Sequence, residues 1–164
     1  MRDKNLSEEK LCVLAARTVQ LARGYGAKVL VNGSASVTQR AGADGVHWTA
    51  AELLTASRRP DCPLVAASCH NEAELDRAAA LGLDFVVLGP VSPTPSHPGG
   101  ATLGWDRYAR LIADYPLPVY ALGGMRAEDL ETSWRSGAQG IGMMRNVWTG
   151  NEALGLTALM AGFA

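Results

Sequence analysis

Short apolar runs alternate with segments of helical periodicity along the chain. Residues 64–67, 85–88 and 119–122 are apolar runs of strand length. Between them, apolar positions recur every three or four residues, as they do on one face of a helix. The pattern predicts strands at 28–31, 45–47, 64–67, 85–88, 119–122 and 140–142, and helices at 8–23, 35–41, 50–54, 72–81, 104–113, 127–137 and from about Met144 onward.

Several predicted helices begin after a residue type that caps helix N-termini. Ser7, Thr49 and Asn71 each carry a side-chain oxygen that can accept a hydrogen bond from an unpaired N–H of the first turn. In the helix that follows Asn71, the spacing predicts four apolar side chains on the inward face: Ala73, Leu75, Ala78 and Leu81.

The strict alternation of strands and helices predicts a single α/β domain over residues 1–164. An open doubly wound sheet and a (β/α)8 barrel both fit this alternation. A similar turn recurs at 42–45, 82–85 and 137–140, where it closes a helix and opens a strand, and this repetition favours the barrel. A full barrel has eight strands and typically about 250 residues, so six strands in 164 residues are two too few.

Composition and charge exclude several classes of protein. Hydrophobic residues make up 48% of the chain, charged residues 19%, and the net charge is −1, which indicates no partner among nucleic acids or acidic membranes. No apolar run reaches the roughly 18 residues of a membrane span. The three cysteines, Cys12, Cys62 and Cys69, form no closely spaced pair, as is typical of a reducing cytoplasm.

Polar and small residues follow the predicted strands, and all three histidines are among them. One histidine in such a place is more often structural than catalytic, but three at one edge of a sheet indicate a site. A zinc site from the histidines and Cys69 is an alternative that lacks the usual ligand spacing. The residues at the strand ends are Asn32, His47, Ser68, His70, Gly89, Thr94, Ser96, His97, Gly123 and Gly124.

Two glycine-rich strand ends predict a phosphate site. Gly123 and Gly124 follow one strand, and residues 142–144 open the predicted last helix, so N–H groups of both would face an anion. Arg145 could add a charged contact. Ordinary turn chemistry is the alternative. Arg2 and Lys4 form a cationic pair before the first helix, which is equally typical of a charged terminus.

Six ordered motifs, between Arg2 and about Trp148, resemble the thiamin-phosphate synthase/TenI superfamily. They are R-D-K at residues 2–4, V-N at 31–32, G-A-D-G-V-H at 42–47, S-C-H at 68–70, G-P-V-S-P-T-P-S-H at 89–97 and A-L-G-G-M at 121–125. The chain most resembles the variant fused behind a MutT-type Nudix hydrolase domain, which also reads A-S-C-H and P-T-x-S-H-P.

The resemblance implies a (β/α)8 barrel of which this chain holds about six strands. In that fold Arg2 and Lys4 lie at the end of the second strand, so strand 1 and most of strand 2 are expected upstream of Met1. A Nudix hydrolase domain is expected as an upstream partner in the natural chain. The open edges of an incomplete barrel would favour a homodimer.

The resemblance also implies an activity and roles for individual residues. Thiamin-phosphate synthases join hydroxymethylpyrimidine diphosphate to thiazole phosphate and release pyrophosphate, with Mg²⁺ as cofactor. Phosphorylated small molecules are therefore the expected substrates. By the same resemblance, Ser68 faces the reacting centre. The other implied ligands are Arg2, Lys4 and Asn32 for pyrophosphate, and Thr94, Ser96, Gly123, Gly124, Met144 and Arg145 for thiazole phosphate.

Three positions depart from the family pattern. Gly33 stands where the family has an aspartate that binds Mg²⁺, and Glu52 aligns with the second acidic ligand. Because Mg²⁺ relies on few protein carboxylates, the loss of one predicts weaker binding. His97 replaces a lysine and is mostly neutral near pH 7, so it supplies less positive charge.

Two alternatives to the synthase stay open. A TenI-type thiazole tautomerase moves a proton without Mg²⁺, and His70 would be its acid/base. The other alternative is a non-catalytic module that binds a phosphate ligand.

Overall fold

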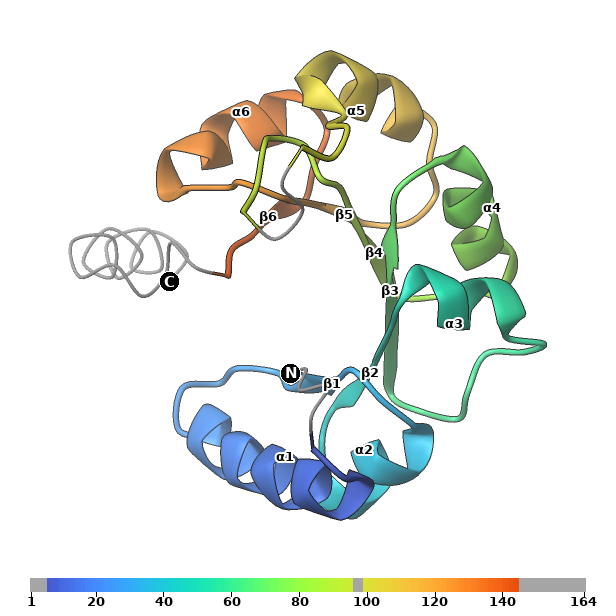
Figure 1. Cartoon of the computed structure of the whole chain (residues 1–164), viewed down its shortest axis with the longest axis vertical. Helices are drawn as coiled ribbons and strands as arrows, with labels where there is room; N and C mark the ends of the chain where they lie inside the picture. Colours follow the sequence, from blue (N-terminus) through green and yellow to red (C-terminus); the bar gives the residue numbers. More distant parts are fainter. Residues whose placement is uncertain (1–5, 96–98, 145–164) are drawn as a thin grey trace. The chain divides into compact units, whose positions relative to one another are not determined.

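The structure is a computed structural model that describes residues 6–95 and 99–144. Six strands alternate with helices, and the order of the strands in the sheet, β1 to β6, follows their order in the chain. The chain divides into two compact units, Met1–Val86 and Val87–Ala164, with the boundary inside β4. Figure 1 labels the elements of both units.

The first unit contains three complete strands and the four helices that precede or follow them. The strands are β1 (Leu30–Val31), β2 (Gly45–Trp48) and β3 (Leu64–Cys69), and the helices are α1 (Glu8–Arg23), α2 (Ala35–Ala41), α3 (Ala50–Thr55) and α4 (Glu72–Ala80). Strand β4 (Phe85–Leu88) follows α4. The second unit continues with α5 (Gly104–Ile112), β5 (Val119–Leu122), the 3-10 helix η1 (Ala127–Asp129), α6 (Leu130–Arg135) and β6 (Gly140–Gly142).

Side-chain caps fix where the helices of the first unit begin. Ser7, Thr49 and Asn71 accept hydrogen bonds from first-turn N–H groups of α1, α3 and α4, as the sequence predicts, and Ser34 caps α2 in the same way. Each cap satisfies a donor that the helix itself leaves unpaired and contributes about 1 kcal/mol. The helix boundaries are therefore set locally.

The strands of the first unit pair parallel and in register. Leu30 pairs with Gly45 and Val46 with Val65. Val31, Val46 and Val65 are fully buried, as expected for parallel strands covered by helices. The carboxyl ends of the three strands therefore lie at one edge of the sheet.

In the turns at 42–45 and 82–85, an aspartate links the turn to the preceding strand segment. Asp44 N donates to Val29 O, and the Asp44 carboxylate accepts the Val29 N–H at 2.8 Å. Asp84 pairs with Val65 in the same two ways, at 2.8 Å and 2.6 Å. Each carboxylate thus binds an N–H group of the preceding strand segment.

In the second unit, β5 and β6 pair parallel. Leu122 of β5 pairs with Gly142 of β6. In the third copy of the turn, Gln139 stands in place of the aspartate, and its backbone N donates to Val119 O as Asp44 N and Asp84 N do to their partners. Tyr108 is fully buried on α5, which raises the pKa of its phenol, and its ring meets that of Trp105 edge to face.

The structure corrects four sequence predictions. Strand β1 starts at Leu30 and not at residue 28, because the Val29 N–H binds the Asp44 carboxylate. The helix predicted at 127–137 is a 3-10 turn followed by α6, since the Asp129 carboxylate binds the Arg126 N–H and tightens the start. On α4, Ala73 is exposed and Glu74 is buried instead, and Leu81 lies just after the helix and is only partly buried.

Some predictions stay open. The helix expected from about Met144 lies outside the described residues, and the single-domain organisation stays a prediction. In the described part of the chain, every helix is too short or too polar to cross a lipid bilayer.

We predict that Asp44→Asn lowers the free energy of unfolding by about 1 kcal/mol at pH 7. The Val29 N–H, and after it Lys28, hold the pKa of Asp44 below its usual value of 3.8. The stabilisation is therefore complete above that value and is lost as the pH falls through the lower pKa of the folded protein. Urea denaturation between pH 7 and pH 3 measures it.

The exposed Asp76 of α4 provides the control. Asp76→Asn should leave stability almost unchanged at every pH. A difference between wild type and Asp44→Asn that persists unchanged at the acid end would contradict the assigned role of the carboxylate.

Candidate functional site

Four of the predicted site residues gather at the strand ends of the first unit. Asn32, His47, Ser68 and His70, here called the strand-end cluster, lie at or just after the carboxyl ends of β1, β2 and β3. Asn32 Nδ2 lies 3.4 Å from His47 Nδ1. An amide nitrogen only donates, so Nδ1 of His47 is the acceptor that this contact calls for. The cluster therefore combines an amide, a hydroxyl and two imidazoles.

Alternation along β3 separates Cys69 from the rest of this cluster. Cys69 is fully buried, whereas Ser68 is partly exposed and His70 exposed. Burial, and secondarily Glu74, raises the pKa of the Cys69 thiol to about 12. Because Cys69 lies in the core while His70 is exposed, the zinc alternative finds no support in the described residues. Cys69 instead anchors the end of β3 in the core.

Glu74 is the residue of this region that the sequence analysis missed. It is 8% exposed, and its carboxylate accepts a hydrogen bond from the His70 backbone N–H at 2.6 Å. A glutamate three residues after a capping Asn71 is a recognisable signal. The helical spacing favoured Ala73 for the inward face, because hydrophobicity alone ranks alanine above glutamate.

The residues expected to hold Mg²⁺ do not make a metal site by themselves. Gly33 has no side-chain ligand. Glu52 Oε2 accepts hydrogen bonds from Thr49 N at 2.7 Å and from Thr49 Oγ1 at 2.8 Å, which is the capping box of α3. Residues 6–95 and 99–144 contain no group of three His, Cys, Asp or Glu side chains that could hold a metal ion. The carboxylate that the sequence assigned to Mg²⁺ thus caps a helix.

The second unit brings the loop after β4 against the turn after β5. Val91 N donates to Leu122 O at 2.8 Å, and Ser92 N donates to Gly123 O at 3.0 Å. A Cβ on Gly89 would lie 2.2 Å from Leu122 O. Only a glycine can come this close to a carbonyl, so the two backbones are in direct contact.

Gly123 and Gly124 are both required at that turn. Their φ angles are +98° and +70°, in the region that favours glycine. A Cβ on Gly123 would lie 2.5 Å from Pro90 Cβ, and one on Gly124 would lie 2.6 Å from Pro93 O. We call residues 89–94 together with Gly123 and Gly124 the glycine platform.

The end of β6 lies beside this platform. Because Leu122 pairs with Gly142, the residues that follow them in the two parallel strands are neighbours at the same edge. Met144 is 59% exposed. The predicted side-by-side placement of the two glycine-rich strand ends is therefore borne out by the register of β5 and β6.

Several predicted site residues lie outside the described residues: Arg2, Lys4, Ser96, His97 and Arg145. Thr94 is described and partly buried on the loop after β4. The roles of all these residues stay predictions.

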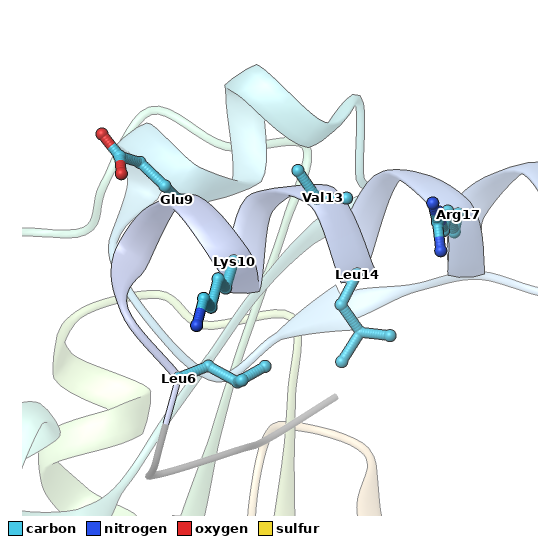
Figure 2. A pocket seen from close by; sticks show the side chains of 6 residues that line it. All are labelled: Leu6, Glu9, Lys10, Val13, Leu14 and Arg17. Carbon is cyan, nitrogen blue, oxygen red and sulfur yellow. The ribbon is translucent and has the colours of Figure 1, made fainter.

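The first unit has a surface pocket beside α1. Figure 2 shows its lining, which comes from Leu6 and the exposed side of α1 and includes Val13 and Leu14. None of the predicted site residues lines it. Val13 and Leu14 are 56% and 40% exposed, and scattered surface apolar residues of this kind are common.

Comparison with known proteins places the chain in a family. The family model described as thiamine monophosphate synthase matches residues 1–147. The chain belongs to the thiamine monophosphate synthase family. It is 35% identical over 156 residues to the thiamine-phosphate synthase of Thermosynechococcus vestitus, and 33% identical over 151 residues to that of Methanoculleus marisnigri.

The matched relatives differ in length. The match covers 89% of this chain and 42% of the Thermosynechococcus protein, but 90% of this chain and 72% of the Methanoculleus protein. Thiamine phosphate pyrophosphorylase from Pyrococcus furiosus has a similar fold, with a TM-score of 0.78 over 99% of this chain and 79% of that chain, at 22% identity. Sequence and fold are thus those of a thiamine-phosphate-synthase-like domain.

We predict that Gly124→Ala lowers the free energy of unfolding by about 3 kcal/mol, because the new methyl group meets Pro93 O at 2.6 Å and the backbone is left-handed. Gly104 has nearly the same φ, +65°, but no atom lies within 4 Å of the place that a methyl group would take there. Gly104→Ala should therefore cost only about 1 kcal/mol. Equal losses in thermal or urea unfolding would refute close packing at Gly124.

Proposed function

We propose that this chain joins hydroxymethylpyrimidine diphosphate to thiazole phosphate, as its family membership suggests. The observation that carries the proposal is the glycine platform. It brings the family's two phosphate-binding segments, the loop after β4 and the turn after β5, into backbone contact. Such contact keeps side chains out of the junction, so a ligand bound over it would meet backbone and small polar groups.

The thiazole phosphate is assigned to the glycine platform. Thr94 and Ser96 would supply hydroxyl groups to it, with Gly123 and Gly124 in the facing turn. The N–H groups of Met144 and Arg145 would complete the site, which the neighbouring ends of β5 and β6 support. His97 would add positive charge only when protonated.

The diphosphate substrate is assigned to the strand-end cluster. Asn32, with Arg2 and Lys4, would hold the pyrophosphate, and Ser68 would face the reacting carbon. In the reaction, the bond from the pyrimidine methylene carbon to pyrophosphate oxygen breaks, and pyrophosphate leaves with the electron pair. The thiazole nitrogen then forms a bond to the same carbon. Cationic groups assist because charge develops on the leaving group.

No step is assigned to Mg²⁺, because Glu52 binds Thr49 and Gly33 offers no ligand. Any role of Glu52 as a metal ligand would require its second oxygen, Oε1, or release from the cap.

Further parts of the proposal concern the context of the chain. We infer that the six strands belong to a (β/α)8 barrel without strand 1 and most of strand 2, which the strand order and the likeness to the Pyrococcus furiosus fold support. The relation to Nudix hydrolase fusions rests on the A-S-C-H and P-T-P-S-H-P sequences. Three free cysteines favour a cytoplasmic location. We further propose that the protein forms a homodimer. Its substrates would be phosphorylated small molecules, and it would bind neither nucleic acid nor membranes.

The tautomerase is a second candidate, favoured by one observation. His70 is exposed at the strand-end cluster, while its backbone is fixed by Glu74. An imidazole can take a proton from carbon and return it elsewhere on the same substrate. This reaction needs no Mg²⁺, so the altered residues at positions 33 and 52 do not affect it.

We predict that the purified chain forms thiamin phosphate from the two substrates in a magnesium titration followed by chromatography. If Glu52 binds the metal, Glu52→Gln should raise the required Mg²⁺ concentration about tenfold. The glutamine oxygen still accepts from Thr49, so helix α3 should persist. Folded protein that binds thiazole phosphate but makes no product would refute the synthase and favour a binding module.

We predict that His70→Asn lowers the rate of thiazole proton transfer at least about 100-fold, since general acid–base catalysis contributes about that much. The rate of thiamin phosphate formation should fall less than about tenfold, because no proton transfer by His70 is assigned to it. Proton exchange followed by NMR in deuterated water measures the first rate. Unchanged exchange in the variant would reject His70 as the base.

A further inference from the structure

Glu74 is a buried acid in a position where the helix needs only an apolar residue. It lies in the first turn of α4, on the side that also buries Leu75 and Ala78. Buried carboxylates are uncommon and need hydrogen-bonding partners. Within the described part of the chain, Thr38, Glu74 and Ser133 are the buried polar residues, and Glu74 alone of them is ionisable.

Both oxygens of Glu74 are engaged on the segment that carries His70. Oε2 accepts the His70 backbone N–H at 2.6 Å, and Oε1 accepts from Asn71 Nδ2 at 2.9 Å. The Asn71 oxygen in turn accepts the Glu74 N–H at 3.0 Å. Hydrogen bonds to a charged acceptor are about twice as strong as neutral ones. The carboxylate and the cap therefore hold each other in place.

The capping box of α3 shows what an ordinary glutamate at the same helix position does. There, Glu52 accepts the backbone N–H of Thr49, the capping residue itself. Glu74 instead reaches the N–H of the residue before the cap, which is His70. This difference directs the buried charge to the residue that carries the imidazole.

Cys69, the residue before His70, is held by the core. The Cys69 side chain is fully buried at the end of β3. The backbone of His70 is thus fixed by a core side chain on one side and by a carboxylate on the other. A backbone held in this way limits where the imidazole can lie.

We propose that Glu74 is a positioning residue that acts through His70. By fixing the His70 backbone, it limits where the imidazole can lie at the strand-end edge, which the proposed proton transfer requires. The effect on catalysis rests on the proposed tautomerase function, whereas the effect on His70 itself does not. The test therefore needs one measurement that requires no activity.

The first measurement is hydrogen exchange of the His70 amide in the full chain, by NMR. Glu74→Gln removes the charge, which weakens the hydrogen bond from the His70 N–H, and it turns an amide donor toward Asn71 Nδ2, so the second hydrogen bond is lost. The His70 amide should then exchange at least about tenfold faster. Glu72→Gln, at an exposed site on the same helix, should leave that exchange within about twofold of wild type.

The second measurement is the rate of thiazole proton transfer. Glu74→Gln should lower kcat about tenfold to 100-fold with little change in KM, as misplacement of a catalytic group does. In a His70→Asn background, the same substitution should have no further effect, because Glu74 then has no imidazole to position. A merely structural role would lower activity equally in both backgrounds.

A double substitution tests rescue. Asn71→Asp combined with Glu74→Gln exchanges amide and carboxylate, so the glutamine can donate to the aspartate and still accept from His70 N–H. It should restore slow exchange and most of kcat.

The outcomes separate the two proposals. Unchanged His70 exchange in Glu74→Gln would overturn the positioning role whatever the activity. Faster exchange, with a wild-type chain that shows no proton transfer, would confirm the hold on His70 and overturn the tautomerase. Equal losses of kcat with and without His70 would overturn action through the imidazole.

Discussion

Parallel pairing of very short strands in register is the constraint on which the rest of this structure depends. The strands are two to six residues long, so each contributes few backbone hydrogen bonds of its own. The register is supported from outside the ladder by Asp44 and Asp84, whose carboxylates each bind an N–H group of the preceding strand segment. With the register fixed, the strand ends and the polar residues on them fall at one edge.

The same residue type serves two purposes at two helix starts. Glu52 completes a capping box, which ties its carboxylate to Thr49 and away from a metal. Glu74 reaches past its cap to His70. Both helices begin with a capping residue followed three residues later by a glutamate. Glu52 accepts the N–H of the capping residue, whereas Glu74 accepts the N–H of the residue before it. One carboxylate therefore caps its own helix, and the other holds the backbone of His70.

In the second unit, two loops meet backbone to backbone because no side chains stand between them. Gly89, Gly123 and Gly124 let two loops approach more closely than any Cβ would allow. The consequence is a surface of backbone and small hydroxyl groups beside the end of β6. Such a surface suits a phosphate group, and it depends on the β5–β6 register as much as on the glycines.

The sequence by itself determined most of the elements, three of the helix caps and the family. Ser7, Thr49 and Asn71 act on donors within a few residues, and apolar periodicity reports helix or strand directly, so these predictions needed no tertiary information. Only the tertiary structure decided which side chains are buried and which distant segments come into contact. Glu74 is buried and Ala73 is not, because hydrogen bonds to His70 and Asn71 offset the desolvation of a carboxylate. Those partners are only three and four residues away, so the capping signal stood in the sequence, but the burial of the carboxylate depends on how α4 packs. The contact of the loop after β4 with Gly123 and Gly124 joins residues about 30 apart, and no local pattern records such a distance.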